Sequence, residues 1–114
     1  MKIIEITNLT KVYSENGNEV VAVNNVNLDF EQGEFTAVVG PSGSGKTTFL
    51  NMVGGIDNPT EGQILVDKVN ICSLKSSELI DFRMNNIGFV FQAYNLIPVL
   101  TAKENVEFIM FLQN

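Results

Sequence analysis

Residues 40–48 read Gly40-Pro41-Ser42-Gly43-Ser44-Gly45-Lys46-Thr47-Thr48, which completes the pattern G-x-x-x-x-G-K-[ST]. In a loop of this kind, consecutive backbone N–H groups converge on an anion at the N-terminus of a helix, where the macrodipole also favours negative charge. Lys46 is then placed to reach the β- and γ-phosphates, and the Thr47 hydroxyl is placed to hold Mg²⁺. This stretch therefore predicts a site for a nucleoside triphosphate.

The sequence on either side of the loop supports this interpretation. Residues 34–39 form a short apolar run that is typical of a buried strand. After the loop, apolar residues recur at helical spacing until Gly54-Gly55: Phe49, Met52, Val53 and Ile56. A flexible Gly/Ser loop that matches by chance would not need this setting, whereas a phosphate-binding loop needs a strand before it and a helix after it.

The N-terminal part of the chain is predicted to form a β-hairpin. Residues 2–13 and 19–30 are rich in Ile, Val, Thr and Phe, and residues 14–18 between them contain turn dipeptides. Further along, residues 57–62 predict a turn into a strand near 63–66. The predicted class is α/β, with an antiparallel N-terminal β subdomain.

Two more helices and one more strand are predicted in the second half. Ser76 or Ser77 is expected to cap a short helix that Asn85-Asn86 ends. Residues 87–91 are expected to form another buried strand. Residues 101–104, Thr-Ala-Lys-Glu, are typical of a capping box that opens a final helix.

Composition limits the class of protein. With 114 residues the chain has room for one domain or part of one, and its net charge of -6 with scattered basic residues argues against a nucleic-acid partner. The single cysteine, Cys72, fits a reducing compartment and is expected to be a small buried or half-buried apolar residue. No apolar run approaches the roughly 18 residues that span a bilayer. The expected location is the cytoplasm.

Several motifs in a fixed order resemble the ATP-binding subunit of ABC transporters, within the macrolide and lipoprotein export branch. Besides the loop at 40–48, these are Tyr13, the Pro-Thr-Glu-Gly turn at 59–62, and residues 87–92, which read Ile-Gly-Phe-Val-Phe-Gln. Residues 95–106, Asn-Leu-Ile-Pro-Val-Leu-Thr-Ala-Lys-Glu-Asn-Val, complete the set. The resemblance runs from about residue 2 to the last residue. It implies a P-loop NTPase-type core.

The resemblance also implies roles for individual residues. Tyr13 occupies the place of the aromatic residue that stacks on adenine, and the alternative is a strand-end tyrosine whose hydroxyl meets water. Gln92 occupies the place of the glutamine that touches Mg²⁺ and the attacking water, and the alternative is a polar residue that closes a strand. Lys46 and Gln92 are the expected catalytic residues, and Thr47 and Gln92 the expected metal ligands. The expected ATP-binding residues are Tyr13, Gly40, Ser42, Gly43, Ser44, Gly45, Lys46, Thr47 and Thr48.

The same resemblance implies an organisation and a set of partners. The hairpin region is assigned to 2–33, the phosphate-loop strand and helix to 34–56, and the glutamine-loop region to 87–101. ATP and Mg²⁺ are the implied cofactors. A transmembrane permease domain and a second ATP-binding subunit are the implied partners, which places the protein on the inner face of the cell membrane. Nucleic acid is not an expected partner.

One stretch imitates the second nucleotide motif of such proteins. Residues 64–67, Ile-Leu-Val-Asp, have an apolar run followed by aspartate, but Lys68 follows where the motif has glutamate. The resembling family has a surface turn here. Asp67 is therefore expected in a turn and not at a metal.

The resemblance is to the N-terminal half of such a subunit. The family's LSGGQ signature, its Mg²⁺-binding aspartate with the catalytic glutamate, and its switch histidine all come later than the helix that ends near Asn114, and the chain contains no histidine. We expect a fold truncated before the second half of the sheet, which binds Mg-ATP without hydrolysing it. The alternatives are a non-catalytic nucleotide-binding or interaction fragment and a small P-loop kinase, although Arg83 is the one arginine available to clamp a transferred phosphate.

Overall fold

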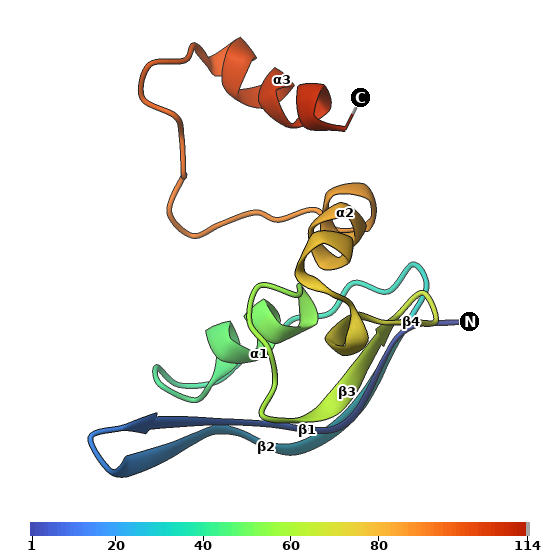
Figure 1. Ribbon diagram of the computed structural model, residues 1–114, viewed down its shortest axis with the longest axis vertical. Helices are drawn as coiled ribbons and strands as arrows, with labels where there is room; N and C mark the ends of the chain where they lie inside the picture. The colour runs from blue at the N-terminus through green and yellow to red at the C-terminus, as the bar shows by residue number, and fades with distance from the viewer. Residues whose placement is uncertain (114) are drawn as a thin grey trace.

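The computed structural model describes residues 1–113, and Figure 1 shows a twisted sheet with helices on one side of it. Within these residues the elements, in chain order, are β1 (Lys2–Glu15), β2 (Asn18–Glu31), α1 (Lys46–Val53), β3 (Glu61–Val66), β4 (Val69–Asn70), the 3-10 helix η1 (Ile71–Ser73), α2 (Ser76–Asn86) and α3 (Ala102–Leu112). No described helix is long and apolar enough to cross a membrane.

The predicted hairpin is confirmed. Strands β1 and β2 pair antiparallel from Glu15 opposite Asn18 at the turn to Lys2 opposite Glu31 at the open end. Asn16 and Gly17 form the turn with positive φ values of 52° and 81°, a conformation that asparagine and glycine tolerate. The register shifts at several points along the pair, so the ribbon is irregular as well as long.

The sheet has the order β2-β1-β3-β4, with every neighbouring pair antiparallel. Strand β3 confirms the strand predicted near 63–66. At Asp67 and Lys68 the chain turns between β3 and β4 with φ values of 47° and 67°. The prediction that Asp67 lies in a turn is confirmed.

Helix α1 packs its apolar face on the sheet and forms the core with it. Phe49 and Met52 of α1 are buried in one cluster with residues of β1, β2, β3 and η1, which are Ile6, Leu9, Val23, Ile64, Val66 and Ile71. Burying side chains of this size contributes about 1.5–3 kcal/mol each. This packing fixes the axis of α1 against the hairpin, and it therefore fixes the loop that precedes α1.

Two predicted strands do not form. Residues 34–39 and 87–91 pair with no other strand in the described part of the chain, and so the prediction of buried strands there is wrong. Phe35 is 100% exposed, Val39 is 86% exposed and Val90 is 102% exposed. Their apolar, β-branched composition favours a strand, but a strand needs a neighbour for its backbone hydrogen bonds and a layer on each face to bury such side chains.

Both helices of the second half begin close to their predicted positions. The Thr101 hydroxyl accepts from the backbone N–H of Glu104 at 3.2 Å, and the Glu104 carboxylate accepts from the Thr101 N–H at 2.8 Å, which confirms the capping box of α3. The cap of α2 is Lys75 instead of Ser76 or Ser77, because the Glu78 carboxylate accepts from the Lys75 N–H at 2.8 Å. A glutamate at the third helical position therefore decides where α2 starts.

Asn105 holds the connection that precedes α3. Its side-chain amide donates to the backbone carbonyls of Ile97, Leu100 and Thr101, and its carbonyl oxygen accepts from the Ile97 N–H at 2.8 Å. At the other end of α3, the Gln113 side chain donates to the Met84 carbonyl of α2 at 2.6 Å. These contacts secure both ends of a helix that stands apart from the sheet (Figure 1).

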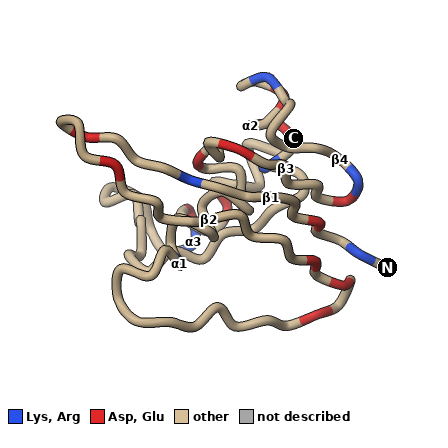
Figure 2. The backbone as a smooth tube through the Cα atoms, turned by 90° about the horizontal axis from the view of Figure 1, so that it is seen from below, with Lys and Arg blue, Asp and Glu red and all other residues tan. Residues whose placement is uncertain are grey.

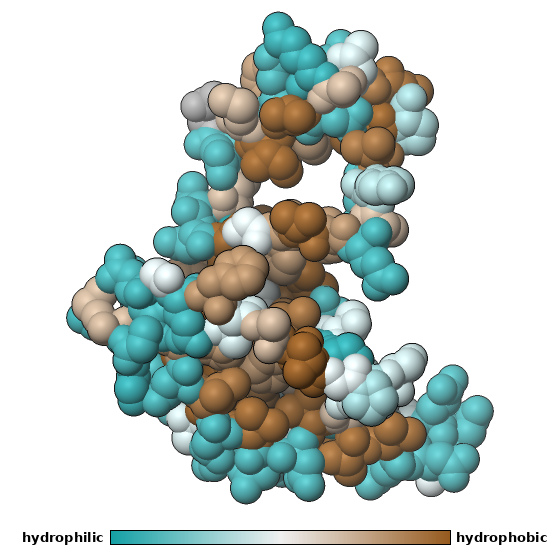
Figure 3. Space-filling model, turned by 180° about the vertical axis from the view of Figure 1, so that it is seen from behind, coloured by the Kyte–Doolittle hydropathy of each residue, from teal (hydrophilic) through white to brown (hydrophobic). Residues whose placement is uncertain are grey.

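Helix α3 exposes most of its apolar side chains. Val106 and Phe111 are each 72% exposed, and no residue of the helix is buried. In Figure 3 apolar surface appears both on this helix and on the body below it. Along the backbone tube of Figure 2, acidic residues are marked near both ends of the hairpin and also around β3.

Candidate functional site

The loop of residues 40–45 turns sharply before it enters α1. Gly43 has φ 79°, and Gly45, the N-cap of α1, has φ 94°, both in the left-handed region that favours glycine. A Cβ atom on Gly45 would lie 2.3 Å from the backbone oxygen of Ala22 in β2. The loop lies directly against the hairpin at this point, so Gly45 has room for a hydrogen but not for a side chain.

The start of α1 presents unpaired backbone donors. The Phe49 N–H makes the first bond of the helix, to the Gly45 carbonyl at 2.9 Å, so the N–H groups of Lys46, Thr47 and Thr48 have no acceptor within the helix. These groups and the positive end of the helix macrodipole point toward the concave side of the loop. An anion is the ligand that this arrangement favours.

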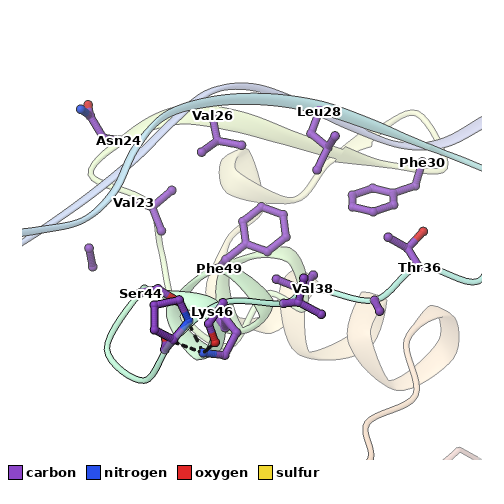
Figure 4. A pocket seen from close by; sticks show the side chains of 16 residues that line it. Val23, Asn24, Val26, Leu28, Phe30, Thr36, Val38, Ser44, Lys46 and Phe49 are labelled. Atoms are coloured by element: carbon purple, nitrogen blue, oxygen red, sulfur yellow. Dashed lines mark hydrogen bonds between the residues drawn. The ribbon is translucent and has the colours of Figure 1, made fainter.

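Lys46 folds back over the loop (Figure 4). Its ammonium donates to the carbonyls of Gly40 and Pro41 at 2.8 Å each, and it lies 3.4 Å from the Ser44 hydroxyl. The Ser44 N–H in turn donates to the Pro41 carbonyl at 3.2 Å. The loop is thus organised around the one cation that it contains.

The hydroxyl-bearing residues of the loop lie at its surface. Ser42, Ser44 and Thr47 are exposed, and Thr48 is half-buried. No group of three or more His, Cys, Asp or Glu side chains that could hold a metal occurs in residues 1–113. A metal ion at this site would therefore rely on a hydroxyl, on water and on ligand oxygens, which is the way Mg²⁺ is commonly held beside phosphates.

A cavity of about 620 Å³ lies beside the loop, between β2 and the extended segment 36–41. Figure 4 shows Val26, Leu28 and Phe30 of β2 facing Phe49 and Val38 across it, with Lys46 at one end. Its lining is mostly apolar. This cavity is an open groove between β2 and segment 36–41, and the N–H groups at the start of α1 belong to the loop at its edge.

Tyr13 lies near the turn end of β1 with its side chain 44% exposed. Its hydroxyl donates to the Asp57 carboxylate at 3.0 Å in an exposed hydrogen bond. Lys11 donates to the other Asp57 oxygen at 3.0 Å and to the Asn58 carbonyl at 2.7 Å, and its ammonium lies over the Tyr13 ring, 5.1 Å from the centroid.

The charge of Asp57 is set by these neighbours. Burial raises the pKa of Asp57, but hydrogen bonds from Lys11 and Tyr13 and the positive charge of Lys11 outweigh this effect, so the pKa lies below its ordinary value. The carboxylate is therefore ionised at neutral pH. Sequence analysis missed Lys11 and Asp57, because nothing in the sequence indicates a contact between residues 46 positions apart.

Gln92 lies on the connection between α2 and α3 and is exposed. Just before Gln92, the Phe89 ring packs against Gly54, so closely that a Cβ atom on Gly54 would lie 2.5 Å from it. The Phe91 ring stacks on the Phe89 ring with a centroid distance of 5.6 Å. Gly54 follows the C-terminal end of α1, whereas Lys46 begins it. No hydrogen bond in the described chain joins Gln92 to the loop, so the structure does not bring the two predicted catalytic residues into contact.

Comparisons with known proteins agree with this arrangement. The sequence profile of the family described as "ABC transporter" matches residues 23–113. An uncharacterised ABC transporter ATP-binding protein of Methanocaldococcus jannaschii, MJ0796, is 49% identical over 91% of this chain and 44% of its own length. The lipoprotein-releasing system ATP-binding protein LolD of Syntrophotalea carbinolica is 47% identical over 90% of this chain and 45% of its own length.

A solved structure shares the fold. The dimeric ATP-binding cassette MJ0796 in a post-hydrolysis state, bound to ADP and Pi, has a TM-score of 0.93 and 45% identity, over 97% of this chain and 48% of its own. The chain therefore spans about half the length of the relatives it matches, and it has the P-loop NTPase-type α/β fold with an antiparallel N-terminal sheet. From its sequence and its fold alike, this chain belongs to the ABC transporter family, among the ATP-binding proteins.

Proposed function

We propose that residues 40–48 bind Mg-ATP and that the chain is the nucleotide-binding portion of an ABC transporter ATPase that powers export. The observation that carries this proposal is the geometry of the loop. Left-handed Gly43 and Gly45 lead the chain into α1, whose first N–H groups have no acceptor within the helix, and Lys46 lies over the same loop. The ADP and Pi bound to the related cassette support the same ligand class.

An equilibrium titration tests the proposal directly. Calorimetry with Mg-ATP and with inorganic tripolyphosphate, which has the phosphates but no base, is expected to give saturable binding of both ligands with ATP the tighter. Tripolyphosphate reports the loop alone, and the difference between the two ligands reports contacts to the nucleoside. Heat signals no larger than dilution for both ligands would remove the proposal.

In the proposed site, Thr47 contributes a hydroxyl ligand to Mg²⁺, and the backbone N–H groups and Lys46 hold the β- and γ-phosphates. Thr48 lies near the α-phosphate. Gln92 is proposed to approach Mg²⁺ and the attacking water, which requires the connection after Phe91 to move its side chain toward the loop. We assign no hydrolytic step to this chain's residues alone, since no carboxylate lies within its loop.

Removing the ring of Tyr13 is expected to weaken ATP binding. If the ring stacks on adenine, Tyr13→Ala loses roughly 1 to 3 kcal/mol, the range for a base stacked on an aromatic side chain. Tripolyphosphate affinity is expected to stay the same, and GTP is expected to compete only modestly worse than ATP. Tyr94→Ala, which removes a tyrosine that is 90% exposed, is the matched control. Equal losses for ATP and tripolyphosphate would contradict the assignment of Tyr13.

Export is the finer part of the proposal. The relatives named for lipoprotein release and, in Mannheimia succiniciproducens, for macrolide export support it, the latter at 42% identity over 93% of this chain and 16% of its own length. We propose a transmembrane permease as one partner and a second ATP-binding subunit as the other, in line with the dimeric cassette. The proposed location is the cytoplasmic face of the membrane.

A small P-loop kinase is the less favoured reading. Such an enzyme needs cationic side chains free to clamp a transferred phosphate. Arg83 instead lies over the Phe89 ring, 5.5 Å from its centroid, and its Nε is buried with no hydrogen-bond partner in the part of the chain described. This guanidinium is part of the packing around α2, so it is not available to a nucleotide.

The chain alone is expected to bind ATP without turning it over at a useful rate. The proposed site lacks a general base, and the resemblance assigns the remaining catalytic groups to sequence that the chain does not contain. Phosphate release and ATP affinity measured on one sample distinguish an ATPase from a chain that binds ATP without hydrolysing it. Turnover that survives purification and disappears in Thr47→Ala would show that the 114 residues are catalytically sufficient.

A further inference from the structure

Lys11, Tyr13 and Asp57 form a cluster that joins β1 to the turn after α1. The Lys11–Asp57 ion pair has side chains only 14% and 33% exposed, whereas the Lys2–Asp29 pair at the open end of the same hairpin is 49% and 43% exposed. Exposed pairs contribute little, because water and salt screen them and ordering two side chains costs entropy. The Lys11 pair is shielded and has a tyrosine hydroxyl as a third member.

Tyr13 lies on the strand next to the one against which the loop of residues 40–45 rests. Gly45 rests on Ala22 of β2, and Val20, two residues before Ala22, is the β-ladder partner of Tyr13. Ala22 is two residues along β2 from Val20, and Val20 is one strand away from Tyr13, so the backbones of Tyr13 and Ala22 lie within roughly 10 Å of each other. Because the Tyr13 hydroxyl reaches Asp57, which follows α1, the side chain projects from the face of the sheet that α1 covers. For stacking on this ring, the base of a nucleotide held by the loop must reach it.

We propose that Lys11 and Asp57 are positioning residues that fix the Tyr13 ring for stacking on the purine base of the bound nucleotide. This rests on the proposed function, since it presupposes a nucleotide at residues 40–48. Asp57 holds the hydroxyl end of the ring, and the Lys11 ammonium lies over one ring face, which leaves the opposite face for the base. A ring that is already held loses less freedom on binding, and this preorganisation increases affinity.

A Tyr13 ring held in this way distinguishes a ligand with a base from one without, but it distinguishes little between different bases. Stacking uses the π-face, which every base has, so the cluster favours a nucleotide over a bare polyphosphate without reading the hydrogen-bonding edge. The competing explanation is that the three residues only tie the hairpin to the turn after α1. That role would alter folding and the loop together, and it would not alter ATP binding selectively.

The test compares ATP with inorganic tripolyphosphate in the variants Lys11→Met and Asp57→Asn. Each variant is expected to weaken ATP binding about fivefold, less than complete loss of stacking, and to leave tripolyphosphate binding within about twofold. Lys11→Arg, which restores a cation, is expected to recover ATP affinity. The matched controls are Lys2→Met and Asp29→Asn, which make the same charge changes in the exposed pair of the same hairpin.

A double variant tests whether Lys11 acts through the Tyr13 ring, by measuring the ratio of ATP to tripolyphosphate affinity. In a Tyr13→Ala background, Lys11→Met is expected to have no further effect on the ratio of ATP to tripolyphosphate affinity, because the ring it positions is gone. In a Tyr94→Phe background Tyr13 is the sole tyrosine, and its fluorescence is expected to change on addition of ATP and not of tripolyphosphate.

The outcomes separate the two claims. Equal weakening of both ligands in Lys11→Met, or no weakening of either, would overturn the positioning role while leaving the phosphate site in place. If Asp57→Asn does not fold, Lys11→Met still decides, because methionine keeps the apolar stem of the side chain. A wild-type chain that bound neither ligand would remove the proposed function and this inference with it.

Discussion

Replacing Lys46 by alanine is expected to weaken Mg-ATP binding by about 2 kcal/mol or more, the scale of a charge-assisted contact removed from a bound anion. Two effects add. The β- and γ-phosphate charges lose their cation, and the carbonyls of Gly40 and Pro41, which Lys46 holds together at 2.8 Å each, lose the donor that shapes the loop. Tripolyphosphate is expected to weaken by a similar amount, since both effects concern phosphates and not the base.

The matched control for Lys46→Ala is Lys103→Ala. It makes the same charge change on α3, where the lysine is 82% exposed and pairs only with Glu107 at 3.6 Å. Calorimetric titration of the wild type and both variants, together with circular dichroism of each, provides the comparison. Equal ATP affinity in the wild type and Lys46→Ala would show that residues 40–48 are not the nucleotide site.

The second large effect concerns assembly. The chain is expected to self-associate at tens of micromolar, the concentration range in which unpaired strands and exposed apolar surface cause association. Segments 34–39 and 87–91 are apolar, extended and unpaired, with Phe35 and Val90 fully exposed. Helix α3 adds a further apolar surface. Sedimentation velocity over a concentration series is the measurement.

A designed pair of variants identifies the surface responsible. Val90→Lys places a charge in the unpaired segment and is expected to shift the sedimentation distribution toward monomer. Ile80→Lys makes the same kind of change at a residue that is 59% exposed but lies within α2, where the backbone N–H and C=O groups are bonded inside the helix, and it is expected to have no such effect. A wild-type chain that sediments as a monomer and melts cooperatively would mean that it closes its own core.

The parts of the fold that local signals determine are predictable from sequence. The turn at Asn16-Gly17, the glycines of the phosphate loop and the Thr101–Glu104 box each have a short-range physical cause, and the hairpin, the loop and the start of α3 are where the sequence places them. The start of α2 is one residue off because Glu78 serves Lys75 in place of either serine. Cap preference favours serine over lysine, but the position of Glu78 decides the start of the helix.

What depends on distant neighbours was not predictable. Residues 34–39 have the composition of a strand, yet strand formation depends on a partner that local sequence does not specify. The same limit applies to the site. Loop and helix residues lie where their spacing puts them, but the contacts of Tyr13 and of Lys11 with Asp57 join sequence positions more than 40 residues apart.

The hydrogen bonds of Asn105 have a mechanical consequence. Because one side chain binds the backbone at Ile97, Leu100 and Thr101, the segment from 97 to the end of α3 is tied together where the helix begins. One bond, from Gln113 to Met84, secures its far end, while its near end continues into the irregular stretch that contains Gln92. A displacement of α3 that breaks the bond to Met84 is therefore expected to be taken up in the irregular stretch around Gln92.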